Sequence, residues 1–599
     1  MKKAKTAQKA KKQKKPQTLA GKIIKTVLSG IAALVIIFSL FSLDGVISPY
    51  KRMISSLAGG YKQSWDNSKV DATGLDLEYN KPDFSKNDIA SAESALSKQI
   101  SDEGTVLLKN DGLMPFNPGT KFSFFGSSSF GSTSLLTSVL GGEGADLKTA
   151  FESAGLAVND QLLEFYQKGA GSKYNLGAGS IGFGANEDFA INECPLSVVL
   201  SEEGLAESFK GTVPVYVMKR IAGEGRDAPR SMYNHTLVKE DQALNYFEPN
   251  STEREILKHL NDNYPGIVLV VNSNYALPLG WVSEYENIKA VLFAPSMNSL
   301  GDIFAGNANP SGRTVDTFAA NLLDSPAAQN YGDYAYLNPD GTQTKYNYVT
   351  YQEGIYVGYK YYETRYEDIV LDQGNPGDFK YDDEVVYPFG FGLSYTDFEW
   401  SGFSVSNPNN NNEDFLVSLE VKNTGAVAGK DVVEIYAQSP YTDYDRENGV
   451  EKPAVSLVAF AKTSNLLPGE SETVTASFRR EQLKSYDSKN AKTFILEPGT
   501  YYITAGKDAH SAVNNILASK GKTVSGNSDL VAAYEPGLTE IDMTYSRDSF
   551  SGAEITNLFD EAAGDAKYLS RNDWIGTFPS HDGQVTSIIS TWGNEINGT

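Results

Sequence analysis

The 599-residue sequence predicts an α/β domain with a mostly parallel sheet, then an all-β domain built as a β-sandwich, with a transmembrane helix near the N-terminus. Three observations support this fold class. Short apolar runs alternate with helix-like stretches over residues 105–318, as expected for buried parallel strands covered by helices on both faces. Beyond residue 412 the apolar period becomes two, which is typical of half-buried strands. An uncharged apolar stretch follows a basic N-terminus.

The charge of the chain divides sharply near its N-terminus. The formal net charge is −23, but residues 1–26 contain ten lysines and no acidic residue. The remainder therefore carries −33, because 42 of the 52 basic residues and all 75 acidic residues lie there. Residues 27–43 (VLSGIAALVIIFSLFSL) are uncharged and lie at the short end of the range that spans a bilayer. We expect 1–26 to be a basic cytoplasmic tail and 27–48 a single-pass anchor in the cell membrane, with the main body outside the cell.

A cleaved signal peptide is the competing interpretation of this N-terminus. No A-x-A-like cleavage site follows the apolar run, and the basic region before it is long. These two features favour the uncleaved anchor.

Composition excludes several other classes of protein. With 40% hydrophobic and 11% aromatic residues the chain can build real cores, so it is not a disordered protein. The acidic main body disfavours nucleic acid as a partner. Cys194 is the only cysteine, and the four histidines are widely spaced. We therefore expect a structural role for Cys194, no internal disulfide, no metal site and no cofactor.

The first folded domain is expected over residues 89–340, after a polar spacer at 49–88. A helix is predicted to begin near residues 85–88, where apolar and small residues repeat up to Ile100. Within the domain, strands are expected at 106–108, 122–125, 213–218, 267–271 and 288–293, and helices at 145–154, 159–167 and 253–263.

The second half of the sequence predicts a structured connector and then the sandwich. Residues 341–400 belong to a stretch rich in Tyr, Gly and Asp with little periodicity, and 401–510 carry the two-residue alternation. Residues 511–599 are polar and loosely patterned, so we expect an extended segment without a core of its own. Strands are expected around 415–421, 433–437, 474–478 and 501–505.

One loop carries a candidate catalytic residue. The apolar strand at 213–218 opens into a loop at the carboxyl edge of the predicted sheet, where α/β sheets bind ligands. Glycines on both sides of Glu224 free the backbone to present its carboxylate, and Arg226 and Asp227 are close enough in sequence to position it or tune its charge. From these residues alone, Glu224 is either a catalytic carboxylate or a solvated loop acid.

Several segments of the chain resemble glycoside hydrolase family 3, and they occur in the order of that family. The beginning and end of its α/β sandwich domain, its connector and its fibronectin type III-like domain all have counterparts here. The matching segments are 103–112 (EGTVLLKNDG), 308–313 (ANPSGR), 351–362 (YQEGIYVGYKYY), 388–395 (PFGFGLSY) and the strands from 415 to 505.

The resemblance implies a retaining β-glycosidase that acts on β-linked glucosides or related β-linked oligosaccharides. In the family, the loop that matches residues 223–225 supplies the general acid/base, which assigns that role to Glu224, with Arg226 and Asp227 as supporting loop residues. The family's nucleophile lies on a (β/α)8 barrel, which needs roughly 250 residues and has no counterpart in this sequence. We therefore assign the nucleophile to no residue of this chain.

Asp573 is a weak alternative for the nucleophile. Residues 572–574 (NDW) resemble the family's nucleophile motif, but the flanking residues resemble the segment that leads into the barrel in members with inverted domain order.

Two hypotheses of function follow. In the first, the chain is the acid/base half of an enzyme whose barrel lies in cis beyond Thr599 or is supplied in trans. In the second, it is a non-catalytic, membrane-anchored protein that binds glycans or assembles with partners.

Overall fold

The structure is a computed structural model. It describes residues 86–130, 147–174, 189–220, 228–233, 235–297, 299–329, 334–338, 340, 342–348, 351–407, 414–558, 560 and 567–579. The expected tail, the anchor at 27–48 and the spacer up to residue 85 lie outside this set. No helix within the described ranges is long and apolar enough to cross a membrane. The chain divides into two units, Met1–Lys86 and Asn87–Thr599, and the elements below belong to the second, with α3 (Lys86–Gly104) starting at the boundary.

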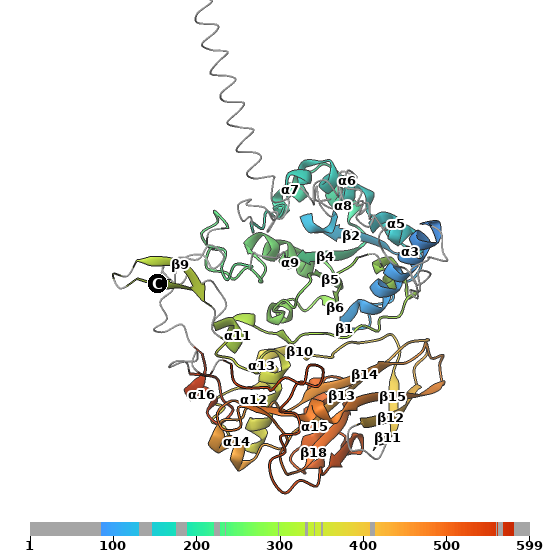
Figure 1. The fold of residues 1–599 in the computed structure, drawn as a ribbon. Helices are drawn as coiled ribbons and strands as arrows, with labels where there is room; N and C mark the ends of the chain where they lie inside the picture. The colour runs from blue at the N-terminus through green and yellow to red at the C-terminus, as the bar shows by residue number, and fades with distance from the viewer. Residues whose placement is uncertain are drawn as a thin grey trace, which may run out of the picture. The chain divides into compact units, whose positions relative to one another are not determined.

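A six-stranded sheet organises the first half of this unit, as Figure 1 shows. Its strand order is β1-β6-β5-β4-β2-β3, and only β1 runs antiparallel to its neighbour. The mostly parallel sheet predicted from the sequence is therefore confirmed. The strands are β1 (Val106–Asn110), β2 (Lys121–Phe125), β3 (Ala157–Val158), β4 (Val213–Lys219), β5 (Ile267–Asn272) and β6 (Ile288–Phe293).

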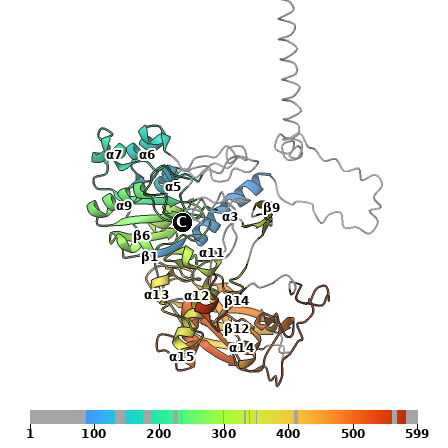
Figure 2. The same ribbon diagram turned by 90° about the vertical axis from the view of Figure 1, so that its left-hand side faces the viewer.

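Both faces of this sheet are buried, which explains the continuous apolar runs. Alternate side chains of β4 enter two separate cores: Tyr216 and Met218 one, Val215 and Val217 the other. The first core also contains α6 (Asp160–Gln167) and α9 (Ser251–Asn263), and the second contains α5 (Leu147–Ser153) and α10 (Leu300–Ala305). Figure 2 shows the sheet and its helices from a second direction. Each fully buried apolar side chain contributes roughly 1.5–3 kcal/mol, so the sheet provides a rigid frame for its loops.

The connector contains a helix that the sequence pattern did not reveal. Helix α12 (Tyr359–Leu371) follows a tight turn and packs beside α13 (Tyr381–Glu384), and β7 (Phe318–Ala319) pairs with β10 (Val385–Tyr387). Seven of the residues of α12 are buried, polar and charged ones among them. A helix buried on most sides has no single apolar stripe, and this accounts for the missing periodicity.

The predicted sandwich is present as two antiparallel sheets. One has the strand order β11-β12-β15 and the other β14-β13-β18-β19, and their facing side chains form a common core. All four predicted strands occur. The strands are β11 (Phe398–Ser406), β12 (Asp414–Asn423), β13 (Val432–Gln438), β14 (Ser456–Lys462), β15 (Ser471–Arg479), β18 (Tyr501–Gly506) and β19 (Val531–Tyr534).

The structure differs from the expected boundary at residue 510. Helix α15 (Ala509–Ser519) is largely buried and belongs to a core with Tyr436, and β19 adds a strand to the sandwich. Further along, Trp574 is fully buried in a core with α12 residues. We predicted an extended segment over residues 511–599. Two parts of it, the end of α15 and residues 567–579, are instead packed into the second half of the unit. The buried apolar residues of α15 do recur at helical spacing, at Ala509, Ala512, Val513, Ile516 and Leu517, and this pattern was overlooked in the sequence.

Shorter elements complete the described chain. These are η2 (Ser127–Phe130), η3 (Ala170–Lys173), α7 (Leu196–Ser201), α8 (Leu205–Ser208), η4 (Gly280–Glu284), η5 (Leu322–Asp324), α11 (Pro326–Gln329), β8 (Tyr334–Leu337), β9 (Gln343–Tyr348), α14 (Asp443–Asn448), η6 (Arg480–Leu483), β16 (Ser485–Asp487), β17 (Thr493–Ile495), η7 (Ser528–Leu530) and α16 (Trp574–Thr577).

Candidate active site

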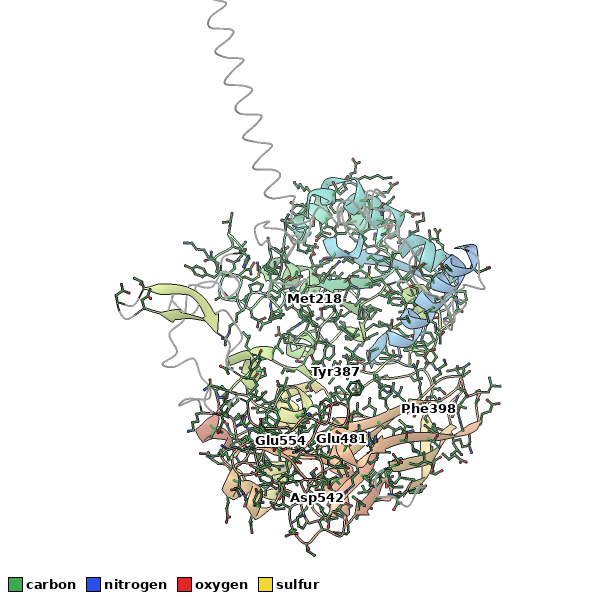
Figure 3. The ribbon with its side chains drawn as sticks, viewed as in Figure 1. Met218, Tyr387, Phe398, Glu481, Asp542 and Glu554 are labelled. Atoms are coloured by element: carbon green, nitrogen blue, oxygen red, sulfur yellow. The ribbon has the colours of Figure 1, made fainter. Side chains whose placement is uncertain are left out.

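The loop predicted to carry the catalytic acid leaves the sheet at the end of β4. This strand lies between β2 and β5 and is parallel to both. Met218, which Figure 3 labels, is a buried residue in the C-terminal half of this strand. Glu224, Arg226 and Asp227 lie in 221–227, outside the described residues. The structure does describe what holds the two ends of this loop.

The first end is anchored by Arg220, which directly follows β4. Its Nε donates to the carbonyl of Tyr246 (2.6 Å), and its Nη2 donates to the carbonyl of Glu248 (2.6 Å). Both Nη atoms also donate to the carboxylate of Glu253, and Nη1 donates to the carbonyl of Lys219. All five N–H groups of the guanidinium are thus used, and the side chain is fully buried.

The second end is anchored to the same segment of chain. Ala228 and Met232 are buried, and the backbone N–H of Met232 donates to the carbonyl of Leu244 (2.9 Å). The residues on both sides of the loop therefore contact one stretch, 244–253, which we call the loop platform. Arg220 and Met232 are both bound to this platform. The positions of the two residues that flank the loop are therefore fixed relative to each other.

The loop platform is itself held rigid by the start of helix α9. Asn250 and Glu253 form a capping box in which each side chain accepts from the other's backbone N–H, at 2.9 Å in both directions. Asp241 adds a second clamp, since its carboxylate accepts from the N–H (2.8 Å) and hydroxyl (2.9 Å) of Ser251. The Glu253 carboxylate therefore takes part both in the N-terminal cap of α9 and in the ion pair with Arg220.

A small polar pocket of ≈ 190 Å³ lies at the end of β4, where Lys219 and Arg220 line it. The ends of β4 and β5 meet there, because Lys219 is in register with Asn272. Burial lowers the pKa of Lys219. Amine, amide and hydroxyl groups of this kind form hydrogen bonds with polar ligands. The pocket is lined by Lys219, Arg220, Asn272, Ser273, Asn274, Tyr275 and Pro295.

A second buried carboxyl group lies at the same edge of the sheet and was missed by the sequence analysis. Glu193 accepts from the N–H of Ser127, which follows β2, at 2.9 Å, and from its own neighbour Cys194 at 2.7 Å. Burial, and then the charge of Glu253, raise the pKa of Glu193 to about 7. Nothing in its sequence context marks it, because its burial depends on chain segments far apart in the sequence.

The described contacts of Asp573 are those of a helix cap. Its side chain accepts from Asn375 Nδ2 (2.6 Å) and from the N–H of Gly576 (2.9 Å), and it precedes the short helix α16. The hydrogen bond from Asn375, followed by that from Gly576, lowers the pKa of Asp573. The next residue, Trp574, is fully buried. These contacts support a structural role in this chain.

Cys194 is buried, and its thiol pKa is raised to about 12 by burial and then by the charge of Glu193. This agrees with the structural role predicted for it, because only the thiolate is a good nucleophile. Among the described residues, no group of three or more His, Cys, Asp or Glu side chains could hold a metal ion.

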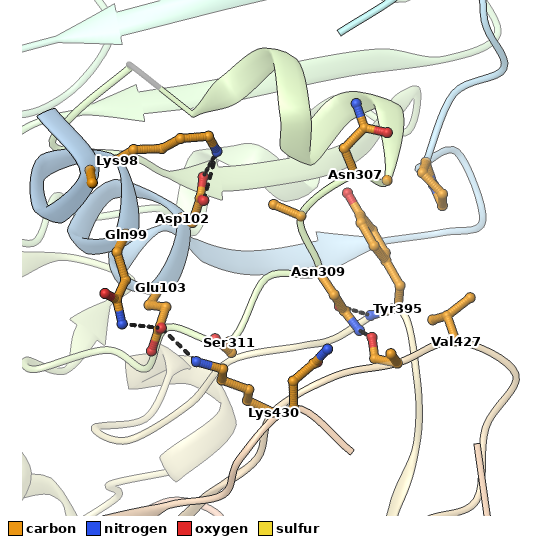
Figure 4. Close-up of a pocket in the computed structure, with 16 residues that line it drawn as sticks. Lys98, Gln99, Asp102, Glu103, Asn307, Asn309, Ser311, Tyr395, Val427 and Lys430 are labelled. Atoms are coloured by element: carbon orange, nitrogen blue, oxygen red, sulfur yellow. Dashed lines mark hydrogen bonds and ion pairs between the residues drawn. The ribbon is translucent and has the colours of Figure 1, made fainter. Parts of the chain in front are cut away.

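A larger pocket of ≈ 670 Å³ lies between α3 and the loop before β13 (Figure 4). Glu103 on α3 accepts from Lys430 (2.7 Å) and also pairs with Lys462 (3.0 Å). Burial alone raises the pKa of Glu103, but the hydrogen bonds from Lys430, Gln99 and Lys462 outweigh it and lower that pKa to about 2. Glu103 of the sheet domain thus pairs with two lysines of the sandwich, Lys430 and Lys462. These ion pairs in the pocket wall join the two domains.

Comparison with known proteins gives two family matches. Residues 105–359 match the model of the glycosyl hydrolase family 3 C-terminal domain, and residues 431–509 match that of a fibronectin type III-like domain. β-Glucosidase A of Butyrivibrio fibrisolvens is 28% identical over 454 residues, which cover 69% of this chain and 49% of that protein. A β-glucosidase of Ruminococcus albus is 26% identical over 431 residues, 69% of this chain and 39% of that protein. The chain therefore spans half or less of the length of these curated relatives.

Two solved structures are similar to this fold at 25% sequence identity. A β-glucosidase from Paenibacillus barengoltzii matches with a TM-score of 0.52, covering 69% of this chain and 42% of that one. β-Glucosidase 3B from Thermotoga neapolitana, solved with α-D-glucose, matches with a TM-score of 0.53, covering 75% of this chain and 54% of that one.

Proposed function

Residues 105–359 of this chain belong to glycoside hydrolase family 3 as its C-terminal domain, and on that premise we propose that the chain supplies the acid/base half of a retaining hydrolase of β-linked glucosides. One observation carries the proposal: in the family-matched domain, the Glu224 loop leaves the carboxyl end of a central parallel strand between two anchored ends, Arg220 and Ala228. The β-glucosidase relatives support the substrate class.

In this mechanism the Glu224 carboxyl group protonates the glycosidic oxygen as the aglycone leaves. A carboxylate about 5–5.5 Å away on the opposite side of the sugar forms the covalent glycosyl-enzyme, and Glu224 then deprotonates the water that hydrolyses it. Arg226 and Asp227 position the Glu224 carboxylate or tune its charge. The pocket at Lys219 and Asn272 offers hydrogen bonds to hydroxyl groups of the substrate.

The nucleophile in this proposal comes from a (β/α)8 barrel, in cis or in trans. No closed parallel barrel occurs in the described ranges, whose parallel pairs all belong to the six-stranded open sheet. The relatives continue well beyond the part that aligns with this chain. These two facts are consistent with a nucleophile that lies outside the described residues.

The test is hydrolysis of an aryl β-glucoside by the enzyme isolated from its own cells, compared with the Glu224→Gln variant. We expect at least a 100-fold loss of kcat/KM when the aglycone is a poor leaving group that has to be protonated, because proton transfer by a positioned side chain contributes roughly that much or more. Glu207→Gln is the matched control, since Glu207 lies in the same domain and its side chain is 73% exposed. Undiminished hydrolysis in Glu224→Gln would exclude Glu224 as the acid/base, and no hydrolysis by either protein would favour the non-catalytic glycan-binding or assembly role.

The location is part of the proposal. Residues 27–48 anchor the chain in the cell membrane, with the ten-lysine tail in the cytoplasm and the hydrolase unit outside. Carbonate extraction should leave the chain in the membrane pellet, and protease added to intact cells should remove the unit from residue 87 onward. Release of the chain by carbonate, or protection from the protease, would contradict this topology.

A further inference from the structure

A lysine and two carboxyl groups meet in the interior of the second half of the unit. Lys452 Nζ donates to Asp445 Oδ2 (2.8 Å) and also to Glu497 Oε2. Asp445 belongs to α14, Lys452 follows that helix, and Glu497 lies just after β17. The side chains of Lys452, Asp445 and Glu497 are 2%, 0% and 2% exposed. We call these three residues the lysine triad, and its reactive groups are shielded from water.

The chain around the lysine triad fixes the positions of all three groups. The N–H of Thr442, the capping residue of α14, donates to Asp445 Oδ2 (2.7 Å), and its hydroxyl donates to Glu497 Oε1 (2.8 Å). The carbonyl of Pro440 accepts a further hydrogen bond from Lys452 Nζ (2.8 Å). The amine is therefore held against the two carboxyl groups, and such positioning accelerates a reaction between neighbouring groups.

The lysine triad has one basic group for two carboxyl groups, and one carboxyl group is held protonated. Burial, and then the Asp445 carboxyl group within hydrogen-bond reach, raise the pKa of Glu497, although the charge of Lys452 opposes them. Asp445 Oδ1 is buried and has no hydrogen-bond partner in the described part of the chain. A proton on Glu497 supplies a donor to Asp445, because two carboxyl groups can hydrogen-bond only when one of them carries a proton. Lys452 and Asp445 then remain as the ion pair.

This arrangement has the groups needed to form an amide bond. Transfer of a proton from Lys452 to Asp445 along their hydrogen bond gives an amine and a carboxylic acid, and burial favours such neutral forms. Cγ is bonded to Oδ2, so a turn of the carboxyl group brings it to the attack distance from Nζ of roughly 3–3.5 Å.

The reaction balances without any other reagent. The Nζ lone pair attacks Asp445 Cγ, an Nζ–Cγ bond forms and a Cγ–O bond breaks. The hydroxyl group of the acid leaves as water together with one proton from the amine. Glu497 donates a hydrogen bond to the carboxyl oxygen that stays, relays the amine proton to the leaving hydroxyl group, and ends as it began. One ammonium and one carboxylate thereby become one amide and one water.

We propose that Lys452 and Asp445 form a self-catalysed modification site, in which an intramolecular amide bond joins Nζ to Cγ and Glu497 is the proton relay. The chain has a single cysteine and so has no internal disulfide; this amide is a covalent link of another kind. It closes the loop from 445 to 452. Because the carbonyl of Lys452 accepts from Arg571 Nη1 (3.0 Å), the bond also steadies the base on which residues 567–579 pack.

The test is peptide mass spectrometry of the full chain, isolated from its own cells and digested with trypsin. Asp445 lies in the tryptic peptide 431–446 and Lys452 in 447–462, because Pro453 blocks cleavage after Lys452. We expect these two peptides as one linked species, lighter than the separate pair by about 18 Da, the mass of one water. Lys98 and Asp102 are the control, since they pair at 2.7 Å while Lys98 is 52% exposed. Trypsin should cleave after Lys98 as usual.

The variant Glu497→Gln tests the proton relay. Glutamine keeps the size and hydrogen bonding of the side chain but cannot relay a proton, so the peptides 431–446 and 447–462 should appear separately. Circular dichroism checks that this variant folds; if it does not, the wild-type digest alone decides. A link retained in the folded variant would overturn the role given to Glu497.

Two results with the wild-type chain would contradict the amide. Separate, unmodified peptides 431–446 and 447–462 would overturn the proposal and leave Lys452 and Asp445 as an ion pair. A link from 447–462 to the peptide 493–507, which contains Glu497, would overturn the assignment of the bond to Asp445. Each of these results is independent of hydrolase activity, so the amide and the proposed function succeed or fail separately.

Discussion

Arg220 and Glu253 form a doubly hydrogen-bonded ion pair at the residue where the candidate acid loop begins, with Nη1–Oε1 at 3.0 Å and Nη2–Oε2 at 2.7 Å. Their side chains are 0% and 3% exposed. The pair joins the end of β4 to the first turn of α9, so it connects the anchor of the loop to the loop platform. A buried pair of this kind is costly to break, because the remaining charge stays desolvated.

Glu253→Gln should destabilise the unit by about 3–5 kcal/mol. The substitution leaves the buried Arg220 charge without its counter-ion and weakens the capping box of α9. Chemical denaturation monitored by tryptophan fluorescence measures the change. Glu284→Gln is the control, because Glu284 pairs with Arg254 while 57% exposed and should cost less than about 1 kcal/mol. Equal effects of the two substitutions would contradict the role given to Glu253.

Glu193 should make the protein less stable as the pH rises from about 4.5 to about 7. Its pKa in the fold, raised to about 7 by burial and the charge of Glu253, lies above its ordinary value of 4.5. The folded state therefore binds the proton more tightly, and this advantage is lost as the pH rises through the folded pKa. The loss amounts to about 3 kcal/mol.

Comparing wild type with Glu193→Gln at several pH values between 4 and 8 tests this dependence. The glutamine variant should show a smaller decline in unfolding free energy across the window. Parallel curves for the two proteins would assign the pH dependence to other groups.

His510 and Glu363 form a further titrating pair, between α15 and α12. His510 Nδ1 lies 2.9 Å from Glu363 Oε2, and the imidazole stacks on Tyr381 with 3.8 Å between ring centroids. Burial lowers the pKa of His510, but the hydrogen bond and charge of Glu363 outweigh it, so that pKa lies above 6.5. The charged pair therefore stabilises the fold fully below pH 6.5, and this contribution is lost as the pH rises through the raised pKa.

Titration of the histidine resonances by NMR should show His510 above its ordinary value. Glu363→Gln should lower the His510 pKa, since burial then acts without the carboxylate. An unchanged His510 titration in that variant would contradict the pairing. Asp443→Asn, at a carboxylate that is 94% exposed, is the control.

Asp368 should hold the segment 567–579 against the connector helix. Its carboxylate accepts from Trp574 Nε1 (2.8 Å) and Gln373 Nε2 (2.7 Å), and it pairs with the buried Arg571. Asp368→Asn replaces an acceptor oxygen by a donor and removes a buried charge, so we expect a loss of about 3–5 kcal/mol. Hydrogen exchange followed by mass spectrometry should accelerate first in 567–579. Unchanged exchange in that segment would contradict the clamp.

The sequence predicted those parts of the fold whose pattern is local. Alternation marked β12, β13, β15 and β18, and continuous apolar runs marked the strands of the sheet, because each pattern reports how one segment meets a core. The same reasoning missed α12 and the buried part of α15. Their buried faces include tyrosines, asparagines and charged side chains that become compatible with burial only through partners elsewhere in the chain.

The candidate site likewise has features that the sequence predicted and features that only the structure revealed. The sequence by itself determined that a strand followed by a glycine-flanked carboxylate lies at the carboxyl edge of a parallel sheet, since strand, turn and loop are neighbours in the chain. Only the tertiary structure decided that Arg220 and Met232 share one platform, that Glu193 is buried at the same edge, and that Asp573 caps a helix. Those relationships join residues up to 198 positions apart, as between Asn375 and Asp573. No local pattern encodes them, because they depend on which distant segments the cores bring together.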